Sequence, residues 1–182
     1  WTYGNRTNSY TLKRMRDCRD YAEARAQYEG IRWPAMRIVV TGTGRVGTGA
    51  VQVLKDMGFH RVSPEDYLEN TYQRPVFTQL AAEDYAAHQD DIPFNKNEYY
   101  TDPQRFHSIF RNYYQVSDIM INGIYWDPKA PAFFTREEMM QPDFRIQVIA
   151  DISCDIAPEA SVPCTLRAST IADPVYGYDP RT

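Results

Sequence analysis

A glycine-rich turn between a β-branched run and a helical pattern is the feature that most constrains this chain. The run Arg37-Ile38-Val39-Val40-Thr41 is followed directly by Gly42-Thr43-Gly44-Arg45-Val46-Gly47, which has the spacing Gly-x-Gly-x-x-Gly. Gly58 stands where the C-cap of the following helix belongs. Apolar residues recur between the two at helical spacing and predict one buried face: Val46, Ala50, Val53, Leu54 and Met57.

A strand, a tight glycine turn and a helix in this order present free backbone N–H groups to a pyrophosphate. Gly42 allows the sharp turn, Gly44 lets a phosphate approach the backbone, and Gly47 lets the helix lie close to the strand. Arg45 lies inside the turn, where it either neutralises phosphate charge or is simply solvated. We therefore predict a dinucleotide-binding turn; the alternative is a glycine-rich turn in an α/β domain that binds no ligand.

The composition narrows the class of protein. A chain of 182 residues is expected to form one main domain, and a net charge of −4 argues against a nucleic-acid-binding surface. No apolar run approaches the roughly 20 residues of a membrane helix, and no signal peptide is recognisable. We expect neither nucleic acid nor a membrane as partner. Cys18, Cys154 and Cys164 form no CxxC pair and the histidines are scattered, which predicts a reducing, cytoplasmic location and no metal site.

Strand patterns alternate with helical ones along the chain. This predicts an α/β fold, a Rossmann-like, doubly wound, mostly parallel sheet. We expect a linker helix within residues 1–34, a nucleotide-binding domain over 35–182, and an inserted helical or loop segment over 68–117. Besides the glycine strand and its helix, we expect helices over 9–29, 82–88 and 104–114, and a short helix opened by the capping box Thr135 to Glu138. We expect a loop over 90–103. The other predicted strands cover residues 59–63, 75–80, 117–125, 146–152 and 174–178.

Ligands of such sheets gather outside the carboxyl ends of the strands. Ser63 and Tyr125 end predicted strands and Ser153 follows one, so we expect them on the same edge as Gly44.

An NAD site has an acidic residue about 20 positions after the first glycine, where it binds the ribose hydroxyls. Ser63 stands near that point, with Glu65 and Asp66 just beyond it, so the acid is displaced or absent. Arg61, close by, leaves NADP open as the cofactor.

Three stretches of the chain resemble the nucleotide-binding domain of saccharopine dehydrogenases: GTGRVGTGAVQVLKDMGFHRVSPEDYL, SDIMINGIYWDPKAPAFFT and VIADISCDIAPEASVPCTLRASTIADPVYGYDP. That family includes the lysine-forming enzymes and the lysine–oxoglutarate reductase half of bifunctional ones, within the alanine dehydrogenase/transhydrogenase superfamily. The likeness runs from about Met36 to Asp179, and the segments INGIYWDPKAP and DISCD are more specific than the glycine turn.

The resemblance implies that saccharopine, NAD or NADP and water give lysine, 2-oxoglutarate and the reduced cofactor. It places the catalytic Lys and His in an N-terminal domain that this chain lacks, so we expect no catalytic residue here and no activity of the chain alone. The cofactor-binding residues that it implies are Gly42, Gly44, Arg45, Val46, Gly47, Ser63, Tyr125 and Ile152. The residues implied to line the cleft beside a small amino-acid substrate are Ser153, Cys154 and Asp155.

Two other interpretations stay open from the sequence. The same scaffold could serve an alanine dehydrogenase-like enzyme, or a nucleotide-binding regulatory module without catalysis, for which the serine at position 63 is the only support. Tyr125 either contacts the cofactor or only covers the sheet edge. Asp155 either binds a substrate ammonium or caps the next turn.

Overall fold

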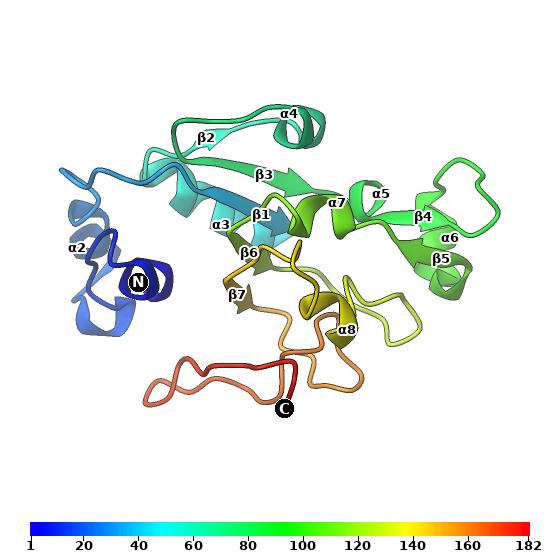
Figure 1. The fold of residues 1–182 in the computed structure, drawn as a ribbon. Helices are drawn as coiled ribbons and strands as arrows, with labels where there is room; N and C mark the ends of the chain where they lie inside the picture. The colour runs from blue at the N-terminus through cyan, green and yellow to red at the C-terminus, as the bar shows by residue number, and fades with distance from the viewer.

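A computed structural model describes residues 1–182, and its centre is a parallel β-sheet. The sheet has five strands in the order β2-β3-β1-β6-β7, and every neighbouring pair is parallel (Figure 1). The predicted α/β, Rossmann-like architecture is confirmed. The bounds of the five strands are β1 Arg37–Thr41, β2 His60–Arg61, β3 Val76–Leu80, β6 Ile119–Asn122 and β7 Val148–Asp151.

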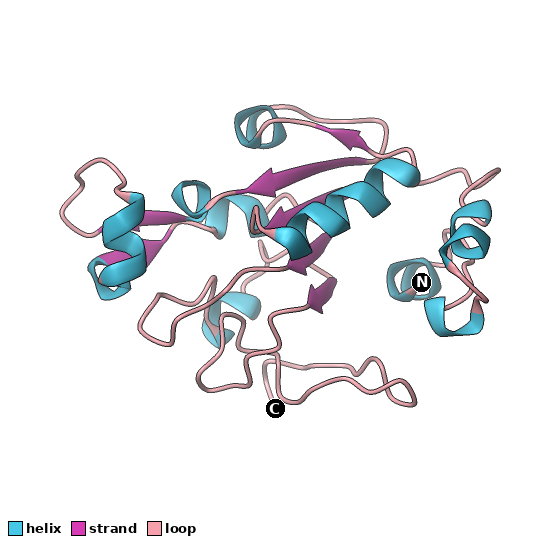
Figure 2. Cartoon of the chain, turned by 180° about the vertical axis from the view of Figure 1, so that it is seen from behind, coloured by secondary structure: helices cyan, strands magenta, loops and turns pink.

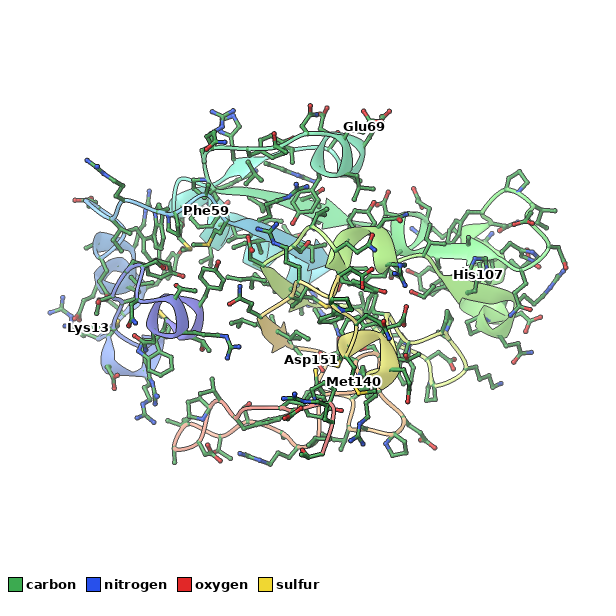
Figure 3. All side chains as sticks on the ribbon, in the orientation of Figure 1. Lys13, Phe59, Glu69, His107, Met140 and Asp151 are labelled. Atoms are coloured by element: carbon green, nitrogen blue, oxygen red, sulfur yellow. The ribbon has the colours of Figure 1, made fainter.

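Helix α3, Arg45–Asp56, covers one face of this sheet, and Figure 2 shows it as the long helix in front of the strands. A separate lobe carries the antiparallel pair β4, Ala86–His88, and β5, Phe106–Ser108; Figure 3 labels His107 on it. The remaining helices are short: α1 Thr2–Thr7, α2 Tyr21–Ala26, α4 Pro64–Glu69, α5 Ala82–Tyr85, α6 Lys96–Thr101, α7 Arg111–Tyr114 and α8 Arg136–Met139, with 3₁₀ turns η1 Met15–Asp17 and η2 Pro103–Arg105.

Strand β1 separates two hydrophobic clusters because successive side chains of a strand point to opposite faces. Ile38 and Val40 belong to the cluster under α3, together with Val51 and Leu54 of that helix. Val39 points the other way, into a larger cluster rich in aromatic residues. Those aromatic residues are Tyr67, Tyr85, Tyr99, Phe106, Phe110, Tyr113, Tyr114, Phe133 and Phe134.

The start and end of α3 agree with the sequence prediction, and so does much of its buried face: Leu54 is buried, and Ala50 and Met57 pack against the cluster under the helix. Gly58 has a φ of +82°, as a residue after a helix C-cap requires. Val46, predicted to be buried, is 44% exposed. The buried face contains Gly47 instead, because the first turn of the helix approaches the glycine turn closely at that residue.

The long helix predicted over residues 9–29 is wrong. Only η1 and α2 form there, and α2 begins after Asp20, whose side chain caps it by accepting a hydrogen bond from the N–H of Glu23. Lys13 and Arg14 would lie near the positive end of a longer helix, which is unfavourable. The N-terminal segment packs against the domain through Trp33, whose ring meets Phe59 edge-on at 5.3 Å.

Residues 68–117 supply β3 to the central sheet and the whole of the lobe. The helices predicted over 82–88 and 104–114 are largely wrong, because each stretch divides into a short helix and a strand of the lobe. The loop predicted over 90–103 contains α6, and residues 174–178 form no strand. Helix α8 begins at the predicted capping box of Thr135 and Glu138.

Candidate functional site

The glycine turn connects β1 to α3 with almost no room for side chains at two of its positions. Gly42 has a φ of +96°, and a Cβ there would lie 2.6 Å from the carbonyl oxygen of Gly123. A Cβ on Gly47 would lie 1.9 Å from the carbonyl oxygen of Gly42. Gly42 is therefore required by backbone conformation, and Gly47 by the close approach of helix to strand.

Gly44, in contrast, faces open space. A Cβ on Gly44 would have no atom within 4 Å, and the residue is the N-cap of α3 without any side-chain cap. The first backbone N–H of the helix with a partner is that of Thr48, which donates to the carbonyl of Gly44 at 2.9 Å. The exposed N–H groups of Gly44, Arg45 and Val46 have no partner. These donors, at the positive end of a helix, fit the pyrophosphate of a dinucleotide.

The ends of β6 and β7 lie on the same edge of the sheet as this turn. Gly123 donates to the carbonyl of Thr41 at 3.1 Å, and Ile152 donates to the carbonyl of Asn122 at 2.8 Å. The hydroxyl of Ser153 donates to the carbonyl of Ile124 at 3.0 Å, which joins the segments that follow the two strands.

Tyr125 and Ile152 are free to contact a ligand. Their side chains are 89% and 52% exposed, although both follow buried or half-buried strands. The structure thus brings the predicted residues of β6 and β7 to the glycine-turn edge.

A buried polar network, which the sequence analysis missed, holds this edge together. Asn122 accepts a hydrogen bond from the Thr41 hydroxyl at 2.7 Å and donates to Asp151 at 2.8 Å and to Ser161 at 2.9 Å. Asp151 also accepts from the Thr165 hydroxyl at 2.6 Å. Figure 3 labels Asp151 at the end of β7. The network fastens residues 152–165 to the sheet, and a polar residue within the apolar run of β6 was its one sequence signal.

The chain bends at Ile152 and Ser153, directly after β7. Cys154 has a φ of +57°, a conformation that non-glycine residues rarely adopt, and its N–H points to the Asp151 carboxylate at 3.4 Å. Partial burial raises the pKa of Asp155, and the neighbouring charge of Asp151 adds to this effect. Both effects disfavour the ionised carboxylate of Asp155, and a cation beside it would offset them.

Ser63 lies on the other side of β1 from Tyr125 and Ser153. It follows β2, which is an edge strand separated from β1 by β3. Its hydroxyl caps α4 by accepting from the N–H of Asp66 at 3.0 Å.

No group of three His, Cys, Asp or Glu side chains is arranged to hold a metal ion, and all three cysteines are free. No helix is long and apolar enough to cross a membrane.

Comparison with known proteins finds relatives of two kinds. The chain is 30% identical over 145 residues to the saccharopine dehydrogenase [NAD(+), L-lysine-forming] of Neurospora crassa. It is 26% identical over 166 residues to the mitochondrial alpha-aminoadipic semialdehyde synthases of Bos taurus and Mus musculus. The resemblance to saccharopine dehydrogenases is confirmed.

The likeness to these relatives covers 79% of the chain in each case. The chain spans 30% of the Neurospora protein and 18% of the bovine and murine ones. No family model matches the sequence.

Proposed function

We propose that this chain is the cofactor-binding domain of an NAD(P)-dependent amino-acid oxidoreductase of the saccharopine dehydrogenase type. The observation that carries the proposal is the open position at Gly44, with unpartnered N–H groups beside it and the ends of β6 and β7 on the same edge. The names of the curated relatives support this class of reaction.

The proposed reaction converts saccharopine, NAD(P) and water into lysine, 2-oxoglutarate and NAD(P)H. The bound cofactor supplies the hydride acceptor. Residues of the chain bind and orient it: Gly42, Gly44, Arg45, Val46 and Gly47 at the pyrophosphate, with Tyr125 and the backbone of Ile152 further along the same edge.

Ser153, Cys154 and Asp155 are proposed to lie beside the amino-acid substrate. Asp155 carries the carboxylate of this set, and an ammonium beside it would offset the burial and the charge of Asp151 that raise its pKa.

Residues 35–182 form the proposed cofactor domain, and residues 1–34 lead to it from a second domain of the same enzyme. That second domain supplies the catalytic Lys and His, so we expect the chain alone to bind dinucleotide without turnover. Hydride transfer requires substrate and acid–base groups to be held in a fixed geometry that one domain cannot provide. Neither nucleic acid nor membrane is a proposed partner.

For the compartment we propose a reducing one, since all three thiols are free. The cytoplasm, which the cysteine pattern of the sequence predicts, is such a reducing compartment. So does the mitochondrion named for the bovine and murine relatives.

Fluorescence titration of the chain with NADH and NADPH tests the proposal. We expect saturable binding of at least one of them, and its loss in Gly44→Val, because the new side chain occupies the open space at the turn. Gly49→Ala is the matched control, since its Cβ also meets no atom within 4 Å but lies in the second turn of α3. A folded chain that binds neither dinucleotide, or a Gly44→Val variant that binds normally, would overturn the proposal.

A further inference from the structure

On one side the glycine strand β1 pairs with β6, and on the other side it pairs with β3, not with β2. Thr41 pairs with Leu80, and the N–H of Gly42 donates to the carbonyl of Leu80 at 3.0 Å. In the usual dinucleotide fold the strand adjacent to the glycine strand ends at the adenosine ribose, where an acid binds the 2′-hydroxyl or an arginine accommodates a 2′-phosphate. Here that position falls at the end of β3, on Ala81, rather than on Ser63 after β2.

Position 81, directly after β3, carries no carboxylate itself. Ala81 has an apolar side chain, and the nearby Asp84 carboxylate already accepts the N–H of Ala81 at 2.7 Å. The next acidic residue, Glu83, is exposed in the first turn of α5. A carboxylate beside Gly42 would repel a 2′-phosphate, and its absence removes that discrimination against NADP.

An arginine reaches this position from the edge strand. Arg61 of β2 donates from Nη2 to Oε1 of Gln79 at 3.1 Å, and Nε2 of Gln79 donates to the carbonyl of Gly42 at 3.0 Å. One amide side chain therefore separates the guanidinium from the glycine turn. Arg61 is exposed and forms no ion pair, so its remaining donors are available to an anion.

We propose that Arg61 binds the 2′-phosphate of NADP and makes the chain prefer NADP(H) to NAD(H). The inference rests on the proposed function, because it assumes that a dinucleotide occupies the glycine turn. A guanidinium binds phosphate through paired, charge-assisted hydrogen bonds, and Gln79 holds this one at the end of β3. The Neurospora relative, in contrast, is named for NAD(+).

Titration with NADPH and NADH, and displacement by adenosine 2′,5′-bisphosphate or 5′-AMP, tests the inference. We expect the wild-type chain to bind NADPH about tenfold or more tightly than NADH, and Arg61→Gln to abolish that difference with little change for NADH. Arg74→Gln is the matched control: Arg74 is exposed too, but it precedes β3 at the opposite edge of the sheet. It should leave both affinities unchanged.

A second variant adds the missing carboxylate. Ala81→Asp is expected to weaken NADPH binding while NADH binding is kept, and aspartate suits position 81 because it is the N-cap of α5. Three results would overturn the role of Arg61 while leaving the proposed function intact. They are equal affinities of the wild type for NADPH and NADH, an unchanged preference for NADPH in Arg61→Gln, and a preference that changes only in Glu83→Gln. Absence of binding of either dinucleotide would refute the proposed function and the inference with it.

Discussion

Asn122 and Asp151 are paired across β6 and β7 and joined by a hydrogen bond of 2.8 Å from Nδ2 to Oδ1. They are the last residues of their strands, at the edge where the glycine turn lies. Since Asn122 is fully buried and also bonds Thr41 and Ser161, this pair fixes the separation between the turn and residues 152–165. The shape of the candidate site depends on it.

Replacing Asn122 by alanine should therefore destabilise the domain. The change leaves the buried hydroxyls of Thr41 and Ser161 without their partner, at a cost of roughly 1–3 kcal/mol for each buried group. The free energy of unfolding from urea titration measures this. Asn97→Ala, on an exposed position of α6, is the control and should change stability by less than about 0.5 kcal/mol. Equal stabilities of the two variants would contradict the structural role of the network.

Two glycines of α3 should respond oppositely to alanine. Gly47→Ala places a Cβ against the carbonyl oxygen of Gly42, so helix and strand must separate, and we expect a loss of roughly 1–3 kcal/mol. Gly49→Ala meets no atom and should gain up to about 1 kcal/mol from helix propensity. Thermal unfolding of both variants gives the comparison. A Gly47→Ala chain as stable as the wild type would show that the helix does not approach the turn so closely.

The aromatic cluster should depend strongly on Phe110. Its side chain is fully buried, with ring centroids 4.8 Å from Phe133 and 5.8 Å from Tyr113. Phe110→Ala leaves a cavity that should cost about 3–5 kcal/mol in unfolding free energy. The exposed Tyr100→Ala serves as the control and should change little. Comparable losses for both would show that the cluster is not the core of this face.

Cys164 should label slowly below pH 10. Burial raises the pKa of its thiol to about 11, so only about 0.1% is thiolate at pH 8. Its rate of alkylation by iodoacetamide should increase about tenfold for each pH unit from 8 to 10, because the thiolate is the reactive form. Mass spectrometry of timed digests measures the rate. Labelling of Cys164 at the rate of an unfolded chain at pH 8 would contradict its burial.

The sequence predicted the central sheet well because its signals are local. The β-branched run of β1, the glycine spacing and Gly58 at the end of the helical pattern fix that unit by themselves. Tyr125 and Ser153 reach the same edge because the carboxyl ends of parallel strands meet there.

The lobe and the strand order were beyond what local patterns can predict. In residues 82–114 short aromatic segments fit a helix and a strand equally well, and tertiary packing around Phe110 and Phe106 decides between them. The placement of β3 beside β1 depends on pairing between segments distant in sequence. The strand that ends beside the glycine turn is therefore followed by Ala81, whereas counting residues from the first glycine points to Ser63.

The most direct test of the central claim is the response of backbone amides to a dinucleotide. In ¹⁵N-labelled chain titrated with NADPH, we expect the largest chemical-shift changes at Gly44, Arg45 and Val46, and smaller ones at Ile152. These amides include the unpartnered donors of the glycine turn. Saturating shifts at other residues with these amides unmoved, or no shifts at all in a folded chain, would contradict the account.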